Sequence, residues 1–280
     1  MLRRPRVLVI AAAACLVVAA VAYVAAMHVG PLQRDDVRVL SGFRSIVGAR
    51  SWRAANSLSH AFDPVTFVLL AVLAAFVGVA RERPRLALTA AVAMLGANLT
   101  TQLLKSALTS ARPIVAGSPV GTHAWPSGHA TAAMSLALAL VVVSPARLRP
   151  YVAAAGGLLA VAVGYSVLLL GWHYPSDVVG GYLMAGAWTC LVAAVALRPA
   201  GAWPRPRAAL AVPALVALVL LAGLAVLAAR HPEEVSGRTT FVAGAAALAA
   251  GAMAIAAGVS AVLSGSGPAP TAAPGRRPPR

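Results

Sequence analysis

Basic and imidazole side chains gather in one stretch of an otherwise apolar chain, between Lys105 and His129. This stretch holds the only lysine of the protein, an Arg-Pro pair at Arg112 and a Pro-Ser-Gly-His turn that ends at His129. Farther along, His173 is followed four residues later by Asp177. Cations, a glycine turn and two histidines that met at one place would form a site for a phosphate group. Such a site requires elements that bring the two stretches together.

Composition places those elements in a membrane. Of the 280 residues, 60% are hydrophobic and only 11% are charged, and the mean hydropathy is +0.82. A soluble globule of this length needs a more polar surface, so we identify a polytopic membrane protein. The net charge of +16 comes from arginines that lie mainly between apolar runs, which indicates membrane topology and lipid headgroup contacts rather than binding of nucleic acid. Cys15 and Cys190 lie inside apolar runs, without the paired spacing of a metal site.

The apolar runs predict the fold class, which is all-α: a polytopic membrane helical bundle with about eight transmembrane helices of roughly 20 residues each. The fourth run is short, and we expect its helix to extend from near His129 to near Ala146. The expected spans are 7–26, 62–80, 86–104, 130–143, 151–170, 178–197, 208–229 and 241–263.

Four segments follow from this pattern. Residues 1–60 hold the first transmembrane helix and an interfacial segment, in which 34–60 has the spacing of an amphipathic helix lying in the membrane surface. Residues 61–200 hold the core helices and the loops that carry the basic and imidazole residues. Residues 201–263 add two transmembrane helices, and the basic tail at 264–280, rich in Gly, Pro and Ala, is expected to be disordered.

The distribution of arginine orients the bundle. With the amino terminus in the cytoplasm, most arginine clusters fall in cytoplasmic loops, and both termini are cytoplasmic. Lys105, Arg112, His129, His173 and Asp177 then all face the outside of the cell membrane. Stretches that are far apart in the sequence are thus predicted to meet at one surface.

The residue types fit a phosphate. A phosphate group carries about two negative charges near neutral pH, and Lys105 and Arg112 supply positive charge, Arg112 through a planar fork that suits two oxygens. The Pro-Ser-Gly turn leads into a helix, so the amides of Ser127, Gly128 and His129 are expected to point at the same oxygens. Gly128 removes the side chain where the ligand comes closest.

The two histidines divide the work. If a helix begins near Pro175, Asp177 lies beside His173, accepts a hydrogen bond from one ring nitrogen and leaves the other free to attack phosphorus. We therefore predict that His173 is the nucleophile and forms a phosphohistidine. Protonated His129 would donate to the leaving oxygen and then take a proton from water. This scheme needs no metal and no cofactor.

Each of these residues also has an ordinary structural explanation. Lys105 at a helix end can extend to the membrane interface, a Pro-Ser-Gly turn can simply precede a helix, and Asp177 can mark a helix start. Their joint occurrence at these spacings favours a site.

The same pattern resembles the three-part signature of a known family. Lys105, six residues and an Arg-Pro pair are followed by the turn that ends at His129, and then by His173, three residues and Asp177. This arrangement resembles the type 2 phosphatidic acid phosphatase superfamily, which includes membrane lipid phosphate phosphatases and, more remotely, soluble vanadium haloperoxidases. The resemblance covers about residues 60–197. It implies a metal-free phosphohistidine mechanism with the roles given above, acting on a lipid phosphate or a polyprenyl diphosphate among the membrane lipids.

One position departs from the family pattern. Where the family has Ser-Arg ahead of the nucleophilic histidine, this chain has Ser166 followed by Val167. The resemblance therefore implies a substrate-binding role for Ser166 and leaves one phosphate-binding arginine missing. Either another cation enters the site, or the substrate is unusual, or the activity is weak. Our hypothesis is that the 34–60 segment supplies the cation, with Arg50 and Arg53 as the candidates on the same side of the membrane.

Three functions fit these observations. The first is a membrane phosphatase that transfers the phosphoryl group to water. The second is a phosphotransferase that passes it from the same phosphohistidine to a lipid or sugar hydroxyl. The third is a noncatalytic relative, weakened at Val167, that binds anionic lipid.

Overall fold

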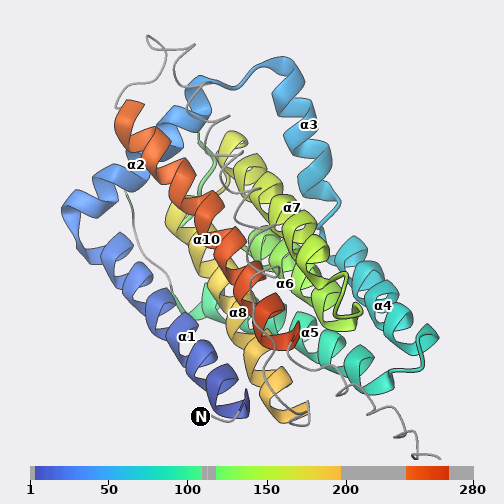
Figure 1. Cartoon of the computed structure of the whole chain (residues 1–280). Coiled ribbons are helices and arrows are strands. Elements are labelled where there is room, and N and C mark those ends of the chain that lie inside the picture. The colour runs from blue at the N-terminus through green and yellow to red at the C-terminus, as the bar shows by residue number, and fades with distance from the viewer. Residues whose placement is uncertain (1–3, 109–111, 113–117, 197–237, 265–280) are drawn as a thin grey trace, which may run out of the picture.

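The structure is a computed structural model that describes residues 4–108, 112, 118–196 and 238–264. All regular secondary structure in these residues is helical, and most of the helices run side by side as a bundle (Figure 1). The helices are α1 (Arg4–His28), α2 (Gly30–Ser45), α3 (Ala49–His60), α4 (Pro64–Ala80), α5 (Pro84–Ala107), α6 (Gly128–Val143), α7 (Arg149–Leu169), α8 (Pro175–Ala196) and α10 (Arg238–Ser264). An all-α fold is confirmed.

The number of membrane spans differs from the expected eight. Five of the described helices, α1, α5, α7, α8 and α10, are long and apolar enough to cross a membrane, and the pair α3 and α4, bent by 60° at its break, raises this to six at most. α6 has 16 residues, which at about 1.5 Å per residue gives roughly 24 Å, less than the hydrocarbon thickness of about 30 Å. It does not extend to Ala146 as expected. The expected span 208–229 and the tail 265–280 lie outside the described residues.

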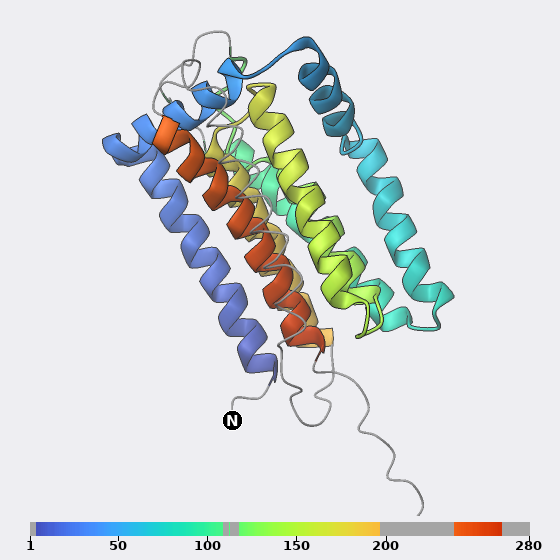
Figure 2. The same ribbon diagram turned by 45° about the horizontal axis from the view of Figure 1, so that its top comes forward.

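The segment expected to be one amphipathic helix forms two helices. α2 and α3 are separated by residues 46–48, and α2 begins directly after α1 with a proline in its first turn, where the missing amide costs no helical hydrogen bond. Both helices lie at one end of the bundle, and the amino terminus of α1 lies at the opposite end (Figure 2). α2 buries Leu40 and Phe43 against the bundle, so it covers the end where the loops with the basic and imidazole residues meet.

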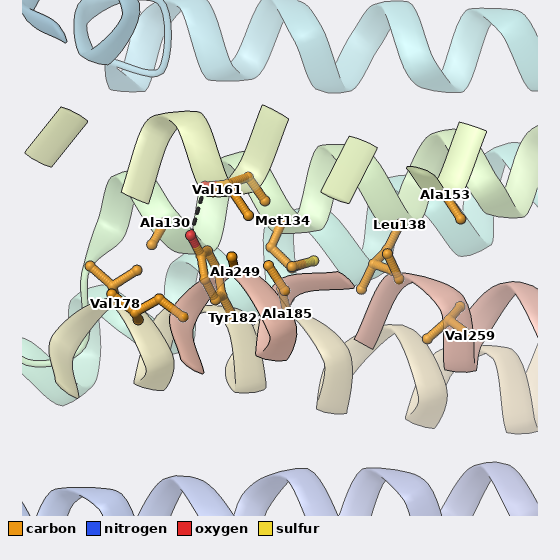
Figure 3. Packing of buried hydrophobic residues seen from close by; sticks show 14 of the residues in the cluster. Ala130, Met134, Leu138, Ala153, Val161, Val178, Tyr182, Ala185, Ala249 and Val259 are labelled. Atoms are coloured by element: carbon orange, nitrogen blue, oxygen red, sulfur yellow. Dashed lines mark hydrogen bonds between the residues drawn. The ribbon is translucent and has the colours of Figure 1, made fainter. Parts of the chain in front are cut away.

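The core forms around α6, which is buried along nearly its whole length. Its helical neighbours α7, α8 and α10 contribute mostly alanine and valine to the same cluster, and small side chains let helices approach closely inside a membrane. Tyr182 and Phe241 are the large exceptions, and the hydroxyl of Tyr182 donates to the carbonyl of Ala160 in α7 at 2.7 Å. Figure 3 shows this bond and the packing around it, with labels on Met134, Leu138, Val161, Val178, Tyr182, Ala185 and Ala249.

The close approach of α8 to the start of α6 yields a stability prediction. A Cβ atom at Gly181 would lie 2.7 Å from the carbonyl oxygen of Ser127 and 3.0 Å from the amide nitrogen of Thr131. Because these are backbone atoms that cannot move aside, Gly181→Ala is expected to destabilise the protein by about 1–3 kcal/mol, the usual cost of overpacking. Thermal unfolding of the detergent-solubilised protein measures the effect.

Gly258→Ala is the matched control. An added Cβ there meets no atom within 4 Å, and alanine favours a helix by roughly 0.5–1 kcal/mol over glycine. Equal melting temperatures for the two variants would contradict the packing described for Gly181.

Candidate functional site

α7 ends at a turn that leads to His173, and backbone hydrogen bonds fix this end. The amide of Trp172 donates to the carbonyl of Val167 at 2.9 Å, and the amide of Gly171 donates to that of Leu168 at 3.0 Å. This pair of bonds defines a Schellman motif. Gly171 takes the left-handed position, with φ of 73°, which glycine adopts without a steric penalty. The helix therefore stops at a defined place just before His173.

α8 begins with Pro175, as the spacing of His173 and Asp177 requires, and Asp177 closes its first turn. Oδ2 of Asp177 accepts a hydrogen bond from the amide of Tyr174 at 2.8 Å. This is the acidic half of a capping box, which satisfies an amide that has no helical acceptor. The sequence thus holds the Asp177 carboxylate at the helix start, next to the loop that carries His173.

His173 and Asp177 form a buried pair. Nδ1 of His173 lies 3.4 Å from Oδ2 of Asp177, an ion-pair distance rather than a short hydrogen bond, and both side chains are buried. Burial lowers the pKa of His173 from its ordinary value, and the Asp177 carboxylate opposes that shift. Because Nδ1 faces the carboxylate, Nε2 is the nitrogen left for chemistry.

The Pro-Ser-Gly-His turn forms the start of α6. Ser127 is the N-cap, and its hydroxyl oxygen accepts a hydrogen bond from the amide of Ala130 at 3.4 Å. The amide of Ser127 donates to the carbonyl of Asp177 at 2.9 Å, which joins the starts of α6 and α8. This amide is therefore engaged within the protein. The amides of Gly128 and His129 lie in the first helical turn, where no helical acceptor exists.

Lys105, in the last turn of α5, lies over Gly128. A Cβ atom at Gly128 would be 3.7 Å from Nζ of Lys105 and 3.3 Å from Nε2 of Gln102. The charge of Lys105 interacts with both His173 and Asp177. Lys105 thus lies in the same cluster as the His173 pair, and Gln102 is a polar neighbour that the sequence did not predict.

His129 lies against the break between α3 and α4. Its Nε2 is 3.4 Å from Oδ1 of Asp63, whose Oδ2 is 2.8 Å from Nδ1 of His60. The His129 ring packs on Trp172 with a centroid separation of 5.5 Å. Burial, and to a smaller extent the proximity of His173, lowers the pKa of His129 to about 4, and the contact with Asp63 opposes this shift. The structure therefore brings both histidines, Asp177 and Lys105 together. Asp63 and Trp172 were not among the predicted site residues.

Arg112 joins this cluster from the side of α2. Its guanidinium donates to Oδ1 of Asp177, and it also donates to Oγ of Ser176 at 3.2 Å and to Oδ2 of Asp36 at 3.4 Å. Its Cζ lies 4.6 Å from the centroid of the Tyr174 ring. Arg112 is buried between two carboxylates, with 7% of its side chain exposed. It must exchange some of these partners before it can bind a phosphate.

Asp36 of α2 is a component that the sequence did not predict. The amide of Ser176 donates to its Oδ1 at 3.0 Å, and the hydroxyl of Ser176 donates to its Oδ2 at 2.5 Å. Burial raises the pKa of Asp36 to about 6, although the hydrogen bonds from Ser176 and the charge of Arg112 counter the shift. The sequence did contain one indication of a role for Asp36. Acidic residues are scarce in this chain, which has only seven, and two of them are adjacent in this helix.

Ser166 is not brought into the cluster by any hydrogen bond among the described residues. Its hydroxyl donates to the carbonyl of Ala162 at 2.8 Å, one turn earlier in α7. Val167, which stands where an arginine was expected, is fully buried and packs in the apolar core that includes Phe43 and Tyr174. An arginine at this position would lose that packing.

Arg44 brings the 34–60 segment to the third motif, the part of the signature that holds His173 and Asp177. Arg50 and Arg53, the expected residues, are exposed on α3. Nη1 of Arg44 donates to the carbonyl of Leu169 at 3.0 Å, an acceptor in the last turn of α7 where a cation is favourable. Its side chain also passes over Gly171, where an added Cβ would lie 3.1 Å from Cδ of Arg44. The arginine of this segment that reaches the end of α7 is therefore on α2 and not on α3.

The cluster presents imidazoles, carboxylates and cations to one another. In the part of the chain that the structure describes, no three His, Cys, Asp or Glu side chains form a group that could hold a metal ion. Two paired systems stand out: His173 with Asp177, and His129 with Asp63. Each imidazole therefore faces its own carboxylate. Separate partners allow one histidine to act as a nucleophile while the other moves a proton.

Comparison with known proteins agrees with the signature. Residues 86–200 match the model of the family described as the PAP2 superfamily, which is the type 2 phosphatidic acid phosphatase superfamily. No curated protein matches the sequence significantly.

A solved structure shares the fold. The crystal structure described as the first transmembrane PAP2 type phosphatidylglycerolphosphate phosphatase from Bacillus subtilis superposes with a TM-score of 0.57 at 21% sequence identity. The match covers 65% of this chain and 94% of that chain. At this identity the similarity concerns the arrangement of the helices.

The burial of Arg112 between carboxylates predicts a structural effect. Arg112→Gln leaves the buried Asp177, with none of its side chain exposed, without its cation. Removing one partner of a buried ion pair costs about 3–5 kcal/mol, so a marked drop in the melting temperature in detergent is expected.

Arg50→Gln provides the control, because Arg50 is exposed and surface charges contribute roughly 0–1 kcal/mol. If the two variants unfold at the same temperature, Arg112 is not held as described.

Proposed function

The chain belongs to the PAP2 superfamily, and from this premise we propose that it is an integral membrane phosphatase that hydrolyses a lipid phosphate or diphosphate through a phosphohistidine. The observation that carries the proposal is the buried His173–Asp177 pair, with Lys105 over Gly128 at the start of α6, which is hydrogen-bonded to the start of α8. A buried imidazole that is held by a carboxylate through one nitrogen presents the other as a nucleophile. A nearby ammonium attracts the negative charge of the group to be attacked.

In the first step of the proposed reaction, Nε2 of His173 attacks phosphorus. The new N–P bond forms as the bond from phosphorus to the lipid oxygen breaks, and the leaving oxygen takes a proton from His129. Asp177 stabilises the positive charge that develops on the His173 ring. The products of this step are the lipid alcohol, or the lipid monophosphate if the substrate is a diphosphate, and the phosphohistidine.

In the second step, water attacks the phosphohistidine. His129, now neutral, takes a proton from this water, the N–P bond breaks and inorganic phosphate leaves. Burial lowers the pKa of His129 to about 4 in the protein without substrate. The Asp63 carboxylate, 3.4 Å from Nε2 of His129, opposes that shift, and the negative charge of a bound phosphate would favour the protonated form further. Lys105 and the amides of Gly128 and His129 hold the phosphate oxygens throughout.

We propose that the site faces the outside of the cell membrane and that both termini are cytoplasmic. The excess of arginine in the loops assigned to the cytoplasm supports this orientation. The amino-terminal end of α1 lies at the opposite end of the bundle from α2 and α3, which cover the site end (Figure 2). A lipid phosphate of the outer leaflet would present its headgroup at that level.

The His173 assignment makes the first functional prediction. The detergent-solubilised protein is expected to release inorganic phosphate from at least one of phosphatidate, phosphatidylglycerol phosphate and a polyprenyl diphosphate. His173→Ala should lower that rate by at least about a thousandfold, because it removes the ring nitrogen that forms the phosphohistidine in the proposed reaction. His28→Ala is the control, since His28 is exposed at the end of α1.

Other outcomes separate the alternative functions. Label that moves from the substrate to an added lipid alcohol, without release of phosphate, would identify a phosphotransferase. Binding of the lipids with neither reaction would identify a noncatalytic relative. Native turnover by His173→Ala would falsify the nucleophile assignment.

Arg44 makes the second functional prediction. Its side chain lies against the end of α7 and the turn two residues before His173, and the arginine missing from the family pattern is at Val167 in the same helix end. Arg44→Ala should lower kcat/KM for the preferred lipid by about tenfold or more, which corresponds to about 1.4 kcal/mol of transition-state stabilisation. Arg44→Lys, which keeps the charge, should recover part of this loss.

The double variant Arg50→Ala/Arg53→Ala serves as the comparison on α3. If it impairs turnover and Arg44→Ala does not, the replacement cation belongs to α3 as the sequence alone suggested, and the assignment of Arg44 is wrong.

A further inference from the structure

An apolar groove runs along the outside of the bundle, between α1 and α10. Its floor is α8, and α2 closes its upper end (Figure 1). The cavity has a volume of about 590 Å³. Its walls are lined by small and aliphatic side chains, among them Val18 and Ala22 of α1 and Ala247, Gly251 and Ile255 of α10. Val18 is half exposed, so this rim of the groove faces outward.

The length of the groove matches one leaflet of a membrane. Its lining on α10 extends from Gly244 to Ile255, and eleven steps of about 1.5 Å give roughly 16 Å. Half of a hydrocarbon core of about 30 Å is roughly 15 Å. The polar lining residues, Asp35, Asp36 and Ser176, are confined to the end formed by α2 and the start of α8. The groove is thus apolar at leaflet depth and polar at headgroup level.

The polar end of the groove is continuous with the candidate active site. Ser176 and Asp36 are hydrogen-bonded to each other and to Arg112. Arg112 donates to Asp177, which pairs with His173. A chain of direct contacts therefore leads from the groove to the predicted nucleophile. Each acidic residue at this end has a cationic partner: Asp35 pairs with Arg38 at 3.0 Å, and Asp36 pairs with Arg112, which it shares with Asp177.

We propose that this groove holds a hydrocarbon chain of the lipid substrate, an inference that rests on the proposed phosphatase function. The substrate class is then a lipid phosphate whose chain reaches to the middle of the bilayer. Apolar burial gives little gain inside a membrane, where the surrounding lipid is equally apolar. The groove instead orients the substrate, because a chain lying between α1 and α10 brings its headgroup to the Asp36–Arg112 end.

This role explains why two helices outside residues 86–200 matter for the site. α1 and α10 lie beyond the part of the chain that matches the family model, yet they form both walls of the groove. These two helices would therefore determine which hydrocarbon chains fit the groove. The residues for the phosphate chemistry come from the core helices α5 to α8.

The groove can be narrowed at one position without disturbing the fold. A Cβ atom at Gly251 would meet no atom within 4 Å, so Gly251→Phe places a ring in the groove. We expect at least a fivefold loss of kcat/KM for a phosphatidate with 16-carbon chains and less than a twofold loss for dihexanoyl phosphatidate, whose chains are too short to follow the groove.

Gly258→Phe is the matched control on the same face of α10. An added Cβ there also meets no atom within 4 Å, and Gly258 lies beyond the last lining residue, Ile255. It should leave the ratio of long-chain to short-chain kcat/KM unchanged. An equal loss for both substrates, or no loss for either, in Gly251→Phe would overturn the proposal.

A binding experiment separates this inference from the proposed reaction. A phosphatidate analogue with a photoactivatable diazirine in its chain is crosslinked to the His173→Ala protein in detergent, and labelled peptides are mapped. Label on the lining residues of α1, α8 or α10 that dihexadecanoyl phosphatidate competes away supports the groove, even if the native protein releases no phosphate. Label only on residues that do not line the groove overturns the inference while leaving the phosphatase proposal intact.

Discussion

The Asp177 carboxylate is the interaction on which the site depends. It accepts the amide of Tyr174 and so closes the first turn of α8, it receives the guanidinium of Arg112, and it faces His173. None of its side chain is exposed, and a buried carboxylate without these partners would carry a large desolvation penalty. The same bonds that make its burial tolerable therefore fix the positions of a cation and an imidazole.

The site is built from helix ends rather than from helix faces. α7 stops at a Schellman motif, α8 starts at a capping aspartate, and α6 starts at a serine N-cap whose amide bonds to the carbonyl of Asp177. Helix ends carry unsatisfied backbone groups and partial charges. Gathering three of them at one place supplies a polar environment inside an apolar bundle, and the close approach at Gly181 holds two of them together.

α2 supplies the site with charged side chains in addition to those of the core helices. It contributes Asp36 to Arg112 and Ser176, and Arg44 to the end of α7. One helix thus holds both sides of the loop that carries His173. It also closes the groove between α1 and α10, so the added helices connect a leaflet-deep apolar surface with a charged site.

The sequence by itself determined the membrane class, the helical fold, most helix positions and the motif residues, because hydropathy and local spacing are properties of short segments. The family signature was confirmed by the match at residues 86–200. Seven of the eight expected spans fall on helices of the described residues, where five helices, or six with the bent pair α3 and α4, are long and apolar enough to cross a membrane. A run as short as α6 is instead buried by its neighbours. Only the tertiary structure decided that Arg112 binds two carboxylates, that Asp36 and Asp63 belong to the cluster, and that Arg44 rather than Arg50 or Arg53 reaches the third motif. These contacts join residues between 65 and 125 positions apart, and no local pattern encodes the side-chain directions that bring them together.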